Sequence, residues 1–361
     1  MNKKISNLEI GVLNYFLTRA FFIGLTFNSL IRLVKQDSWI VPLLSLIVGF
    51  IFILAVNYIS NYKPDLNIAE KINSLFGTIS SKVVLIFLFV IVFVYCIINY
   101  INLNNFIHSQ FLNNTPIMII SIMFMIAMAY ILYKGIVVIA RTSSVLFYIG
   151  IILFIISLFM LIPSFEISNL KPFFQFSGKN LVKSINCFYA LNISPMFILT
   201  IIPKKDIENP KIKKAITLSY LLSTITLFFV IFATISTFGY ELTSLYEYPE
   251  FHVLKHIYFI GTSSRIESIL VIQWIFDSFI YNILALYFCS VCIKNFSKKI
   301  KISLKNLGLL CCAVVLVMVN LLSRYDIYLN NFILKYAYVS ISIIVSLLTI
   351  IICLKIKIGK S

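Results

Sequence analysis

The sequence predicts an all-α polytopic membrane protein with about ten transmembrane helices. Three observations support this prediction: 60% of the 361 residues are hydrophobic, only 12% are charged, and the mean hydropathy is +0.99. A typical soluble domain is about 25% charged, so a soluble globular protein is excluded. Each membrane-spanning helix needs about 20 apolar residues, and such helices use up most of the chain. We therefore expect a single integral membrane domain over residues 1–361.

Ten apolar runs of membrane-spanning length follow one another along the chain, and polar, Pro-containing or Lys-rich segments separate them. The runs cover residues 10–33, 38–59, 82–104, 116–133, 139–163, 182–202, 214–238, 266–292, 304–323 and 333–353. Divided equally, they give two halves of five spans, one over about 8–163 and the other over about 182–353.

The net charge of +17 indicates how the chain lies in the membrane. With the N-terminus in the cytosol, 20 of the 30 Lys and Arg residues fall on the cytosolic side and nine fall outside. Cytosolic loops carry the excess of cations in membrane proteins, so both termini are expected in the cytosol. This distribution explains the basic charge without a nucleic-acid partner, and none is expected.

Four connecting segments are long enough to carry surface helices, and two of them are the most informative. Residues 60–81 predict an amphipathic helix with Ile68, Ile72 and Leu75 on one side. The outer segment 239–264 is the longest and the most acidic, and we expect it to act as a lid or as a docking surface.

Neither a metal nor a cofactor is expected. His252 and His256 have the i, i+4 spacing of metal ligands, but the spacing fixes no third ligand, so two half-exposed histidines are the favoured interpretation. Cys289 and Cys292 form a CxxC pair without a second pair, at the end of an apolar run. Both motifs are therefore interpreted as structural.

Two charged residues lie within membrane spans, where a charge is expensive and usually marks a site, a pathway or a partner. Asp277 lies near the middle of the eighth span and shares a helical face with Gln273 and Tyr281. Arg19 lies slightly to the cytosolic side of the middle of the first span. The two differ in depth by roughly 6 Å, which an Arg side chain can cover. We hypothesise an Arg19–Asp277 pair, and the alternative is that each finds separate polar partners or water.

Residues that break or polarise a helix interrupt the first and the sixth spans. They are Gly24, Thr26 and Asn28 in the first span, and Asn192, Ser194 and Pro195 in the sixth. Pro195 lacks an N–H and is expected to free the carbonyls near Leu191 and Asn192. Spans one and six occupy matching positions in the two halves, and paired broken helices in inverted repeats place a substrate site at the midplane. The alternative is two ordinary helices that are kinked.

Several stretches resemble the B subunits of bacterial spore germinant receptors, the spore-germination permease family of the amino acid, polyamine and organocation superfamily. The stretches are ISNLE, QDSWIVPLLSLI, KGIVVIARTSSVLF, NLKPFF, YPEFHVLKHI and RIESILVIQWIF, in that order. They run from Ile5 to about Phe276, so the resemblance covers most of the chain.

The resemblance implies a LeuT-type fold, in which two inverted repeats of five helices place broken helices at positions one and six. It also implies a nutrient-sensing role at the spore inner membrane, together with an A-type membrane subunit and a C-type lipoprotein. The implied pocket lies between spans one, three, six and eight. Its residues here are Gly24, Thr26, Asn28, Tyr95, Asn99, Asn192, Ser194, Pro195, Gln273, Asp277 and Ser278.

Tyr95 and Asn99 share a face of the third span, and interhelical hydrogen bonding is an alternative role for them. The leading functional hypothesis is a ligand-sensing membrane subunit that binds a nutrient germinant such as an amino acid. The alternative is a symporter of amino acids, small solutes or cations on the same fold. An enzyme is not expected, because no paired acids or nucleophile in a recognisable catalytic pattern accompany His108, His252 and His256.

Overall fold

The computed structural model describes residues 4–255, 267–296, 301–323 and 338–359, and these residues are mostly helical. Nine segments of the described residues are long and apolar enough to cross a membrane, and the first, Asn7–Asn61, has 55 residues and contains two of the ten predicted runs. The prediction of an all-α polytopic membrane protein is therefore confirmed.

Eight helices of membrane-spanning length are continuous in the described residues. They are α3 (Ile40–Asn61), α5 (Thr78–Gln110), α6 (Ile117–Lys134), α7 (Ile136–Leu161), α9 (Ile212–Leu245), α11 (Glu267–Phe296), α12 (Leu304–Leu322) and α14 (Tyr338–Ile358).

Two further spans are interrupted, and they are the first and the sixth, as the sequence predicts. The first consists of α1 (Asn7–Leu17), a π turn η1 (Phe22–Thr26) and α2 (Phe27–Val34). The sixth consists of α8 (Gly178–Phe188), a π turn η5 (Tyr189–Ile193) and a 3₁₀ segment η6 (Ser194–Ile201). The two broken spans contact each other along their length, α1 with η6, η1 with η5, and α2 with α8.

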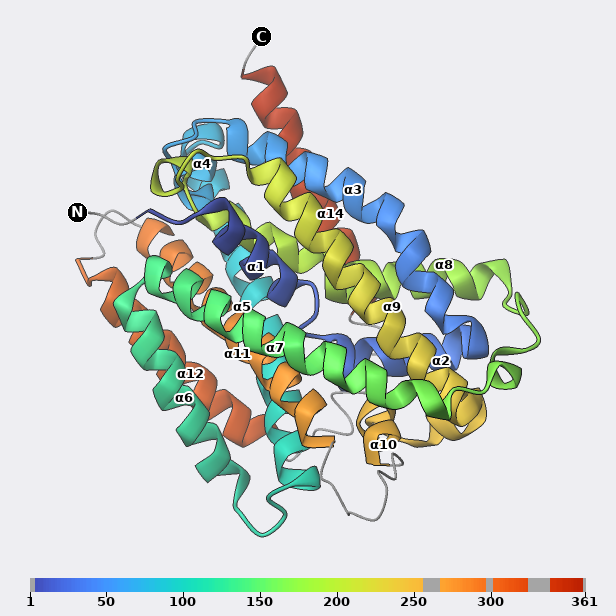
Figure 1. Ribbon diagram of the computed structural model, residues 1–361. Helices are drawn as coiled ribbons and strands as arrows, with labels where there is room; N and C mark the ends of the chain where they lie inside the picture. The colour runs from blue at the N-terminus through green and yellow to red at the C-terminus, as the bar shows by residue number, and fades with distance from the viewer. Residues whose placement is uncertain (1–3, 256–266, 297–300, 324–337, 360–361) are drawn as a thin grey trace.

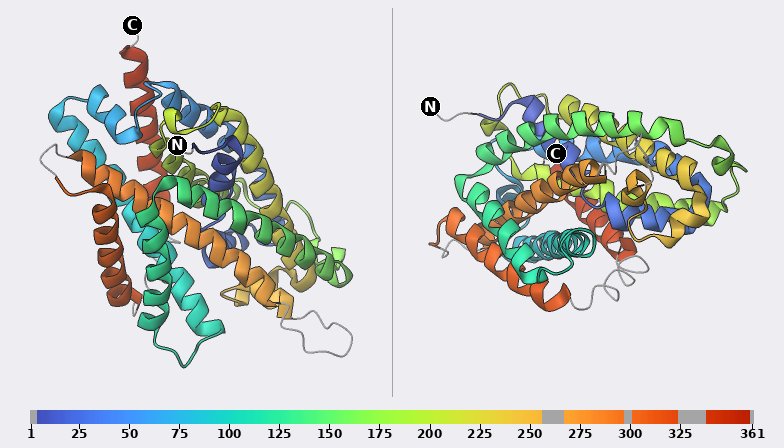
Figure 2. Two further views of the ribbon diagram at one scale, coloured as in Figure 1. Left: turned by 60° about the vertical axis from the view of Figure 1, so that its left-hand side comes forward. Right: turned by 60° about the horizontal axis from the view of Figure 1, so that its bottom comes forward.

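The continuous helices surround this broken pair. In Figure 1, α11 crosses the molecule and packs against both α5 and α7, whereas α9 packs against α1 and α3. The helices α6 and α12 lie side by side at one flank, as the left view of Figure 2 shows. The breaks of the first and sixth spans therefore lie inside the bundle, where they are shielded from lipid.

Two short helices lie at opposite ends of the bundle in Figure 1. The helix α4 (Ile68–Leu75) lies near the C-terminal end of the chain, and Ile68 and Ile72 are fully buried, which confirms the amphipathic helix predicted within 60–81. The helix α10 (Pro249–Lys255) lies at the other end, within the segment predicted to be a lid. The two ends of the protein are hereafter called the α4 end and the α10 end.

The α4 end is held together by polar contacts. Lys71 is buried, and its Nζ donates to the carbonyls of Ile59 and Ser60 at the end of α3, at 2.9 and 3.2 Å. Burial, with the positive charge of Lys204, lowers the pKa of Lys71 to about 8. The N-terminal segment is joined to the connection between the sixth span and α9 by a parallel bridge between Ile5 and Ile207.

Two helices extend beyond their predicted apolar runs. The helix α5 continues to Gln110 because polar residues in its last turns, such as the fully buried Asn104, pack inside the protein. The helix α9 reaches Leu245 only across a kink at Gly239, where φ is +70°, so its straight part ends where the predicted run 214–238 ends. Hydropathy alone ends α5 too early, since it counts polar residues as solvent-facing.

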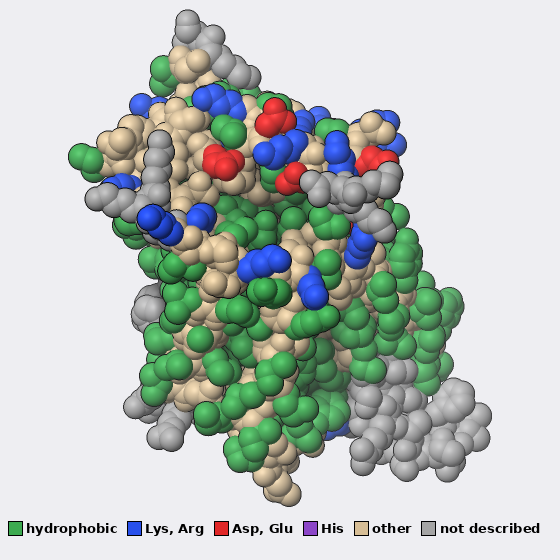
Figure 3. Space-filling model, turned by 90° about the vertical axis from the view of Figure 1, so that its left-hand side faces the viewer, with side chains coloured by type: hydrophobic (Ala, Val, Ile, Leu, Met, Phe, Trp, Pro, Cys, Tyr) green, Lys and Arg blue, Asp and Glu red, His purple; other side chains and the backbone are tan. Residues whose placement is uncertain are grey.

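The surface of the protein has the pattern of a membrane protein. Figure 3 shows Lys and Arg side chains gathered mainly toward the upper end of one face, whereas hydrophobic side chains cover the middle and lower parts. Apolar side chains on several helices are more than half exposed, among them Ile47 on α3, Met123 on α6 and Phe159 on α7. A bilayer provides the apolar surroundings that such a surface requires.

Candidate functional site

The break in the first span centres on Gly24, which has φ +75° and ψ −19°. The preceding residue, Ile23, is extended with ψ 131°, so the helical hydrogen-bond pattern is lost between α1 and α2. Glycine suits this place, because a residue with a Cβ rarely adopts a positive φ. An added Cβ would also lie 2.8 Å from the ring of Tyr248 and 3.0 Å from Oδ1 of Asn102.

Five backbone carbonyls in this break accept hydrogen bonds from side chains. The pairs are Asn192 Nδ2 to Thr18 O at 2.8 Å, Asn99 Nδ2 to Ala20 O at 2.7 Å, Thr26 Oγ1 to Phe21 O at 2.9 Å, Asn102 Nδ2 to Ile23 O at 3.0 Å, and Asn28 Nδ2 to Gly24 O at 3.1 Å. Unsatisfied backbone groups are costly at membrane depth, so broken helices need such partners. The polar residues around the break therefore stabilise its irregular backbone.

The break in the sixth span is stabilised in a similar way. Pro195 cannot donate a backbone hydrogen bond, and the chain changes there from a π turn to a 3₁₀ segment. The carbonyl of Ala190 accepts from the Tyr95 hydroxyl at 2.6 Å and from Ser194 Oγ at 2.7 Å. This carbonyl lies one residue before Leu191, where the sequence places the first freed carbonyl.

The structure brings Arg19 and Asp277 together. Arg19 Nε lies 3.1 Å from Asp277 Oδ2, and the two side chains are 4% and 2% exposed. Arg19 also donates to Thr226 Oγ1 on α9, and its guanidinium lies 5.0 Å from the centre of the Tyr15 ring. Each group of such a pair compensates the charge of the other, and removal of either partner would leave an isolated buried charge.

Four residues on α11 each keep one buried polar atom without a hydrogen-bond partner among the described residues. One is the indole Nε1 of Trp274, and the other three are Gln273 Oε1, Asp277 Oδ1 and Ser278 Oγ. Buried polar atoms are nearly always hydrogen-bonded in native proteins, so free ones mark a place where a ligand or water is expected. All three lie on the α11 stretch that contains the partner of Arg19.

The space between α5, η6 and α11 is narrow. Tyr95, Ser194, Pro195 and Tyr281 line a cavity of about 30 Å³, which has room for about one water. Phe21, from the break, packs edge-on against Tyr95 and Tyr281 with ring centres 5.0 and 4.8 Å apart. Small-molecule sites are commonly about 300–1,000 Å³, so these helices must separate before an amino acid can enter here.

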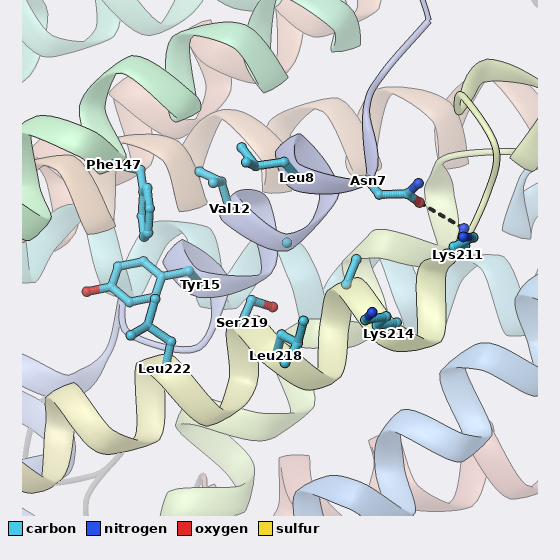
Figure 4. Close-up of a pocket in the computed structure, with 12 residues that line it drawn as sticks. Asn7, Leu8, Val12, Tyr15, Phe147, Lys211, Lys214, Leu218, Ser219 and Leu222 are labelled. Carbon is cyan, nitrogen blue, oxygen red and sulfur yellow. Dashed lines mark hydrogen bonds between the residues drawn. The ribbon is translucent and has the colours of Figure 1, made fainter.

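A larger cavity of about 380 Å³ lies between α1, α7 and α9 (Figure 4). It extends from the exposed Leu8 to the buried Tyr15, whose ring packs against Phe147 at 5.0 Å. Tyr15 in turn contacts the candidate site, since its hydroxyl accepts from Gln273 Nε2 at 3.3 Å. Tyr15 therefore contacts both this cavity and the polar face of α11.

Aromatic side chains cover the first break on the α10 side. Phe106 contacts Tyr248, Phe251 and Trp274 with ring centres 4.7, 5.3 and 4.3 Å apart. All four residues are 1% exposed. The segment predicted to be a lid or docking surface therefore supplies a buried cover over Gly24. His252 stacks on Tyr246, and His256 lies outside the described residues.

The structure divides the eleven predicted pocket residues into two sets. Those on the broken spans and on α5 mostly hydrogen-bond to freed backbone groups or to one another, whereas those on α11 keep free polar atoms. For Tyr95 and Asn99 the contacts agree with the interhelical role that was left open. A role of any of these residues in binding a ligand stays a prediction.

Three residues that contribute to the site are not among those the sequence suggests. Asn102 lies three residues after Asn99, and this spacing could have placed it on the same face of the third span. Asn282 donates to Asn99 Oδ1 at 2.9 Å and thus connects α11 to the break, and its signal was the i+4 spacing from Ser278. Glu250 lies in a segment with two other glutamates, and no spacing in the sequence distinguishes it from them.

Comparison with known proteins supplies a family and a fold. The family model described as "Spore germination protein" matches residues 12–328. No curated protein matches the chain by sequence.

Similar solved structures include a manganese transporter from Eremococcus coleocola in complex with an aromatic bis-isothiourea substituted compound, with a TM-score of 0.59 and 10% identity. Two mutants of that transporter give TM-scores of 0.62 and 0.60 with 9% and 10% identity. Each comparison covers 95% of this chain and 76% of the transporter. The chain therefore has the LeuT-type transporter fold that the resemblance implied.

Proposed function

The chain belongs to the spore germination protein family, and we propose that it is the transporter-like membrane subunit of a spore germinant receptor. In this proposal it binds a nutrient germinant of the amino-acid class and so triggers germination. The proposed partners are an A-type membrane subunit and a C-type lipoprotein, and the proposed location is the spore inner membrane. Both termini are placed in the cytosol, on the evidence of the 20 cations at that side against nine outside.

The observation that carries this proposal is the set of free polar atoms on α11 beside the broken first span. Gln273 Oε1 and Asp277 Oδ1 are acceptors that suit the ammonium group of an amino acid, and Ser278 Oγ can donate or accept. Arg19 lies against Asp277 and offers further donors to a carboxylate. An amino acid carries both charges, so this short stretch matches its two ends.

The narrow cavity beside Tyr95 suggests how binding would be signalled. A ligand shifts a receptor only when it binds two states unequally. Here an amino acid enters only if Phe21 moves or α5 and α11 separate, and the widened arrangement is then the state that the ligand selects. We propose that this widening is what the partner subunits sense.

Two serines on α11 provide a matched test. Ser278 Oγ is free, whereas Ser290 Oγ donates to the carbonyl of Leu286 at 2.6 Å, and both residues are buried. Spores that carry Ser278→Ala are expected to need roughly tenfold more amino acid for the same germination rate, the loss of about one ligand hydrogen bond. Spores with Ser290→Ala should respond like the wild type. If a panel of amino acids gives the same response curves for both variants, at equal protein levels, the ligand binds elsewhere.

The second candidate function is a symporter of amino acids, small solutes or cations, and the fold shared with a metal transporter is the observation behind it. Reconstitution in proteoliposomes separates the two functions. A receptor subunit is expected to bind labelled amino acid without concentrating it when a sodium or proton gradient is applied. Uptake that follows the gradient would establish transport in place of sensing.

A further inference from the structure

Glu250 is a buried carboxyl group without a counter-ion. Three acidic side chains are buried among the described residues, namely Asp37, Glu250 and Asp277. Asp37 accepts from the backbone N–H groups of Phe174 and Gln175 at 2.9 and 2.7 Å, and Asp277 pairs with Arg19. Glu250 is 2% exposed, and no side chain in the described part of the chain hydrogen-bonds to either of its carboxyl oxygens. Glu250 therefore differs from the other two.

The carboxyl group lies at the break of the first span. Burial raises the pKa of Glu250 to about 8, and the peptide groups of Glu250 itself and of Gly24 offset this only in part. The ring of Tyr248, two residues earlier, lies against Gly24 as well. The segment that contains α10 thus places a carboxyl group where the backbone of the first span is unwound.

Two amide oxygens at the same break also lack partners. Asn28 and Asn102 use their Nδ2 atoms on the carbonyls of Gly24 and Ile23, which leaves Asn28 Oδ1 and Asn102 Oδ1 free of hydrogen bonds among the described residues. Asn102 Oδ1 lies 3.0 Å from the position that a Cβ on Gly24 would take. Oxygen atoms from α2, α5 and α10 therefore gather around one glycine.

Carboxylate and amide oxygens are acceptors, and a positive charge satisfies several of them at once. We propose that Glu250, with the amide oxygens of Asn28 and Asn102, forms a site for one small monovalent cation at the broken first span. Two sources share this chemistry, an inorganic ion such as Na⁺ or K⁺ and the primary ammonium group of a germinant. A single carboxylate balances a single positive charge, so a monovalent cation fits better than a divalent one.

The surroundings of Glu250 favour the protonated carboxyl, so a cation that binds there must displace the proton. Asn28 of α2 and Asn102 of α5 bond to the carbonyls of the break, and Trp274 of α11 contacts the ring of Tyr248; all three are uncharged. The titratable groups nearest in sequence are Tyr248, whose ring lies against Gly24, and the half-buried His252, which stacks on Tyr246. On α10, Lys255 is exposed and lies over the ring of Phe251. A buried carboxyl in these surroundings holds a proton at neutral pH, and it releases that proton when a cation takes its place.

Heat unfolding of the purified full-length chain in detergent tests this site. The probes are the chloride salts of sodium, potassium and methylammonium, with choline chloride as a bulky control, at constant ionic strength. At least one small cation is expected to raise the Tm of the wild type in a saturable manner, by roughly 3 °C. Glu250→Gln should lose this rise. Glu241→Gln, which changes an exposed acid at the same end of the protein, should keep it.

Infrared spectroscopy of the wild type provides a second readout that does not depend on the folding of a variant. The band of the protonated carboxyl should weaken when the effective cation is added, because that cation replaces the proton. A response to sodium or potassium identifies an inorganic ion, and a response to methylammonium identifies an ammonium ligand. The proposal requires at least one small cation whose effect on both the Tm and the carboxyl band is larger than that of choline. It is overturned if no such cation is found, or if Glu250→Gln responds like the wild type.

This inference depends on the proposed function only for the ammonium source, and the two can fail separately. The cation readouts use no amino acid, so they stay informative if amino acids bind elsewhere. Ser278→Ala should leave the cation response unchanged, whereas Glu250→Gln should abolish it.

Discussion

Asp277 and Glu250 are both buried carboxyl groups beside the broken first span, yet their surroundings differ. Asp277 has the guanidinium of Arg19 at 3.1 Å, whereas Glu250 has neither a counter-ion nor a side-chain hydrogen-bond partner among the described residues. Burial without a partner favours the neutral form of a carboxyl, and a nearby cation favours the charged form. The comparison indicates that the two acids have different roles: Asp277 is held in a buried ion pair, and Glu250 is the acid of the proposed cation site.

The largest expected effect comes from breaking the Arg19–Asp277 pair. Arg19→Gln and Asp277→Asn should each reduce stability by about 3–5 kcal/mol, because each leaves one buried charge unpaired. The double variant should recover part of this loss, since it leaves no isolated charge. Protein accumulation in the membrane and Tm in detergent provide the measurement. A double variant no more stable than the worse single variant would count against the pair.

A smaller effect is expected from the pH dependence of Glu250. Its pKa is raised from 4.5 to about 8 in the folded protein, so the folded state binds more protons than the unfolded state between these values. Stability that is present below about pH 4.5 is therefore lost as the pH rises toward 8, by at most about 1.4 kcal/mol per pH unit. Glu250→Gln should remove this slope. Chemical unfolding of both proteins at pH 5, 6, 7 and 8, without small cations, measures the difference, and parallel pH profiles would show that Glu250 is not buried as described.

The smallest of these effects is expected at Gly24, on which the free oxygens converge. Gly24→Ala should cost about 1–2 kcal/mol, because a positive φ is unfavourable for alanine and the new Cβ meets the ring of Tyr248. Gly178→Ala is the matched control, since Gly178 lies in the first turn of α8, has no positive φ and has nothing within 4 Å of an added Cβ. The two Tm values provide the comparison, and equal values would mean that the break tolerates a side chain.

Much of this fold could be predicted from the sequence because membrane spans leave strong local signals. Long apolar runs located the helices, and Gly24 and Pro195 marked both interruptions. The depth difference between Arg19 and Asp277 was also readable, since each residue of a helix adds a fixed rise. The division of the chain into repeats over 8–163 and 182–353 stays a prediction.

Which polar residues stabilise the broken backbone and which keep free atoms could not be predicted in this way. Asn99 and Ser278 look alike as polar residues inside apolar runs, and only the positions of the freed carbonyls distinguish them. Asn99 donates to the carbonyl of Ala20, whereas Ser278 Oγ has no partner among the described residues. The burial of Glu250 likewise depends on how α10 folds back over the first break, which involves residues more than 200 positions apart.

The most direct test of the account measures Tm and amino-acid affinity together for one residue of each kind. Asn99→Leu should lower Tm strongly, because it removes the donor to the carbonyl of Ala20 and one of the two acceptors of the Asn282 amide. The affinity of the folded fraction should stay near that of the wild type. Ser278→Ala should leave Tm nearly unchanged and weaken binding roughly tenfold. If instead Asn99→Leu abolishes binding in well-folded protein, and Ser278→Ala binds as tightly as the wild type, the assignment of free polar atoms to the ligand is wrong.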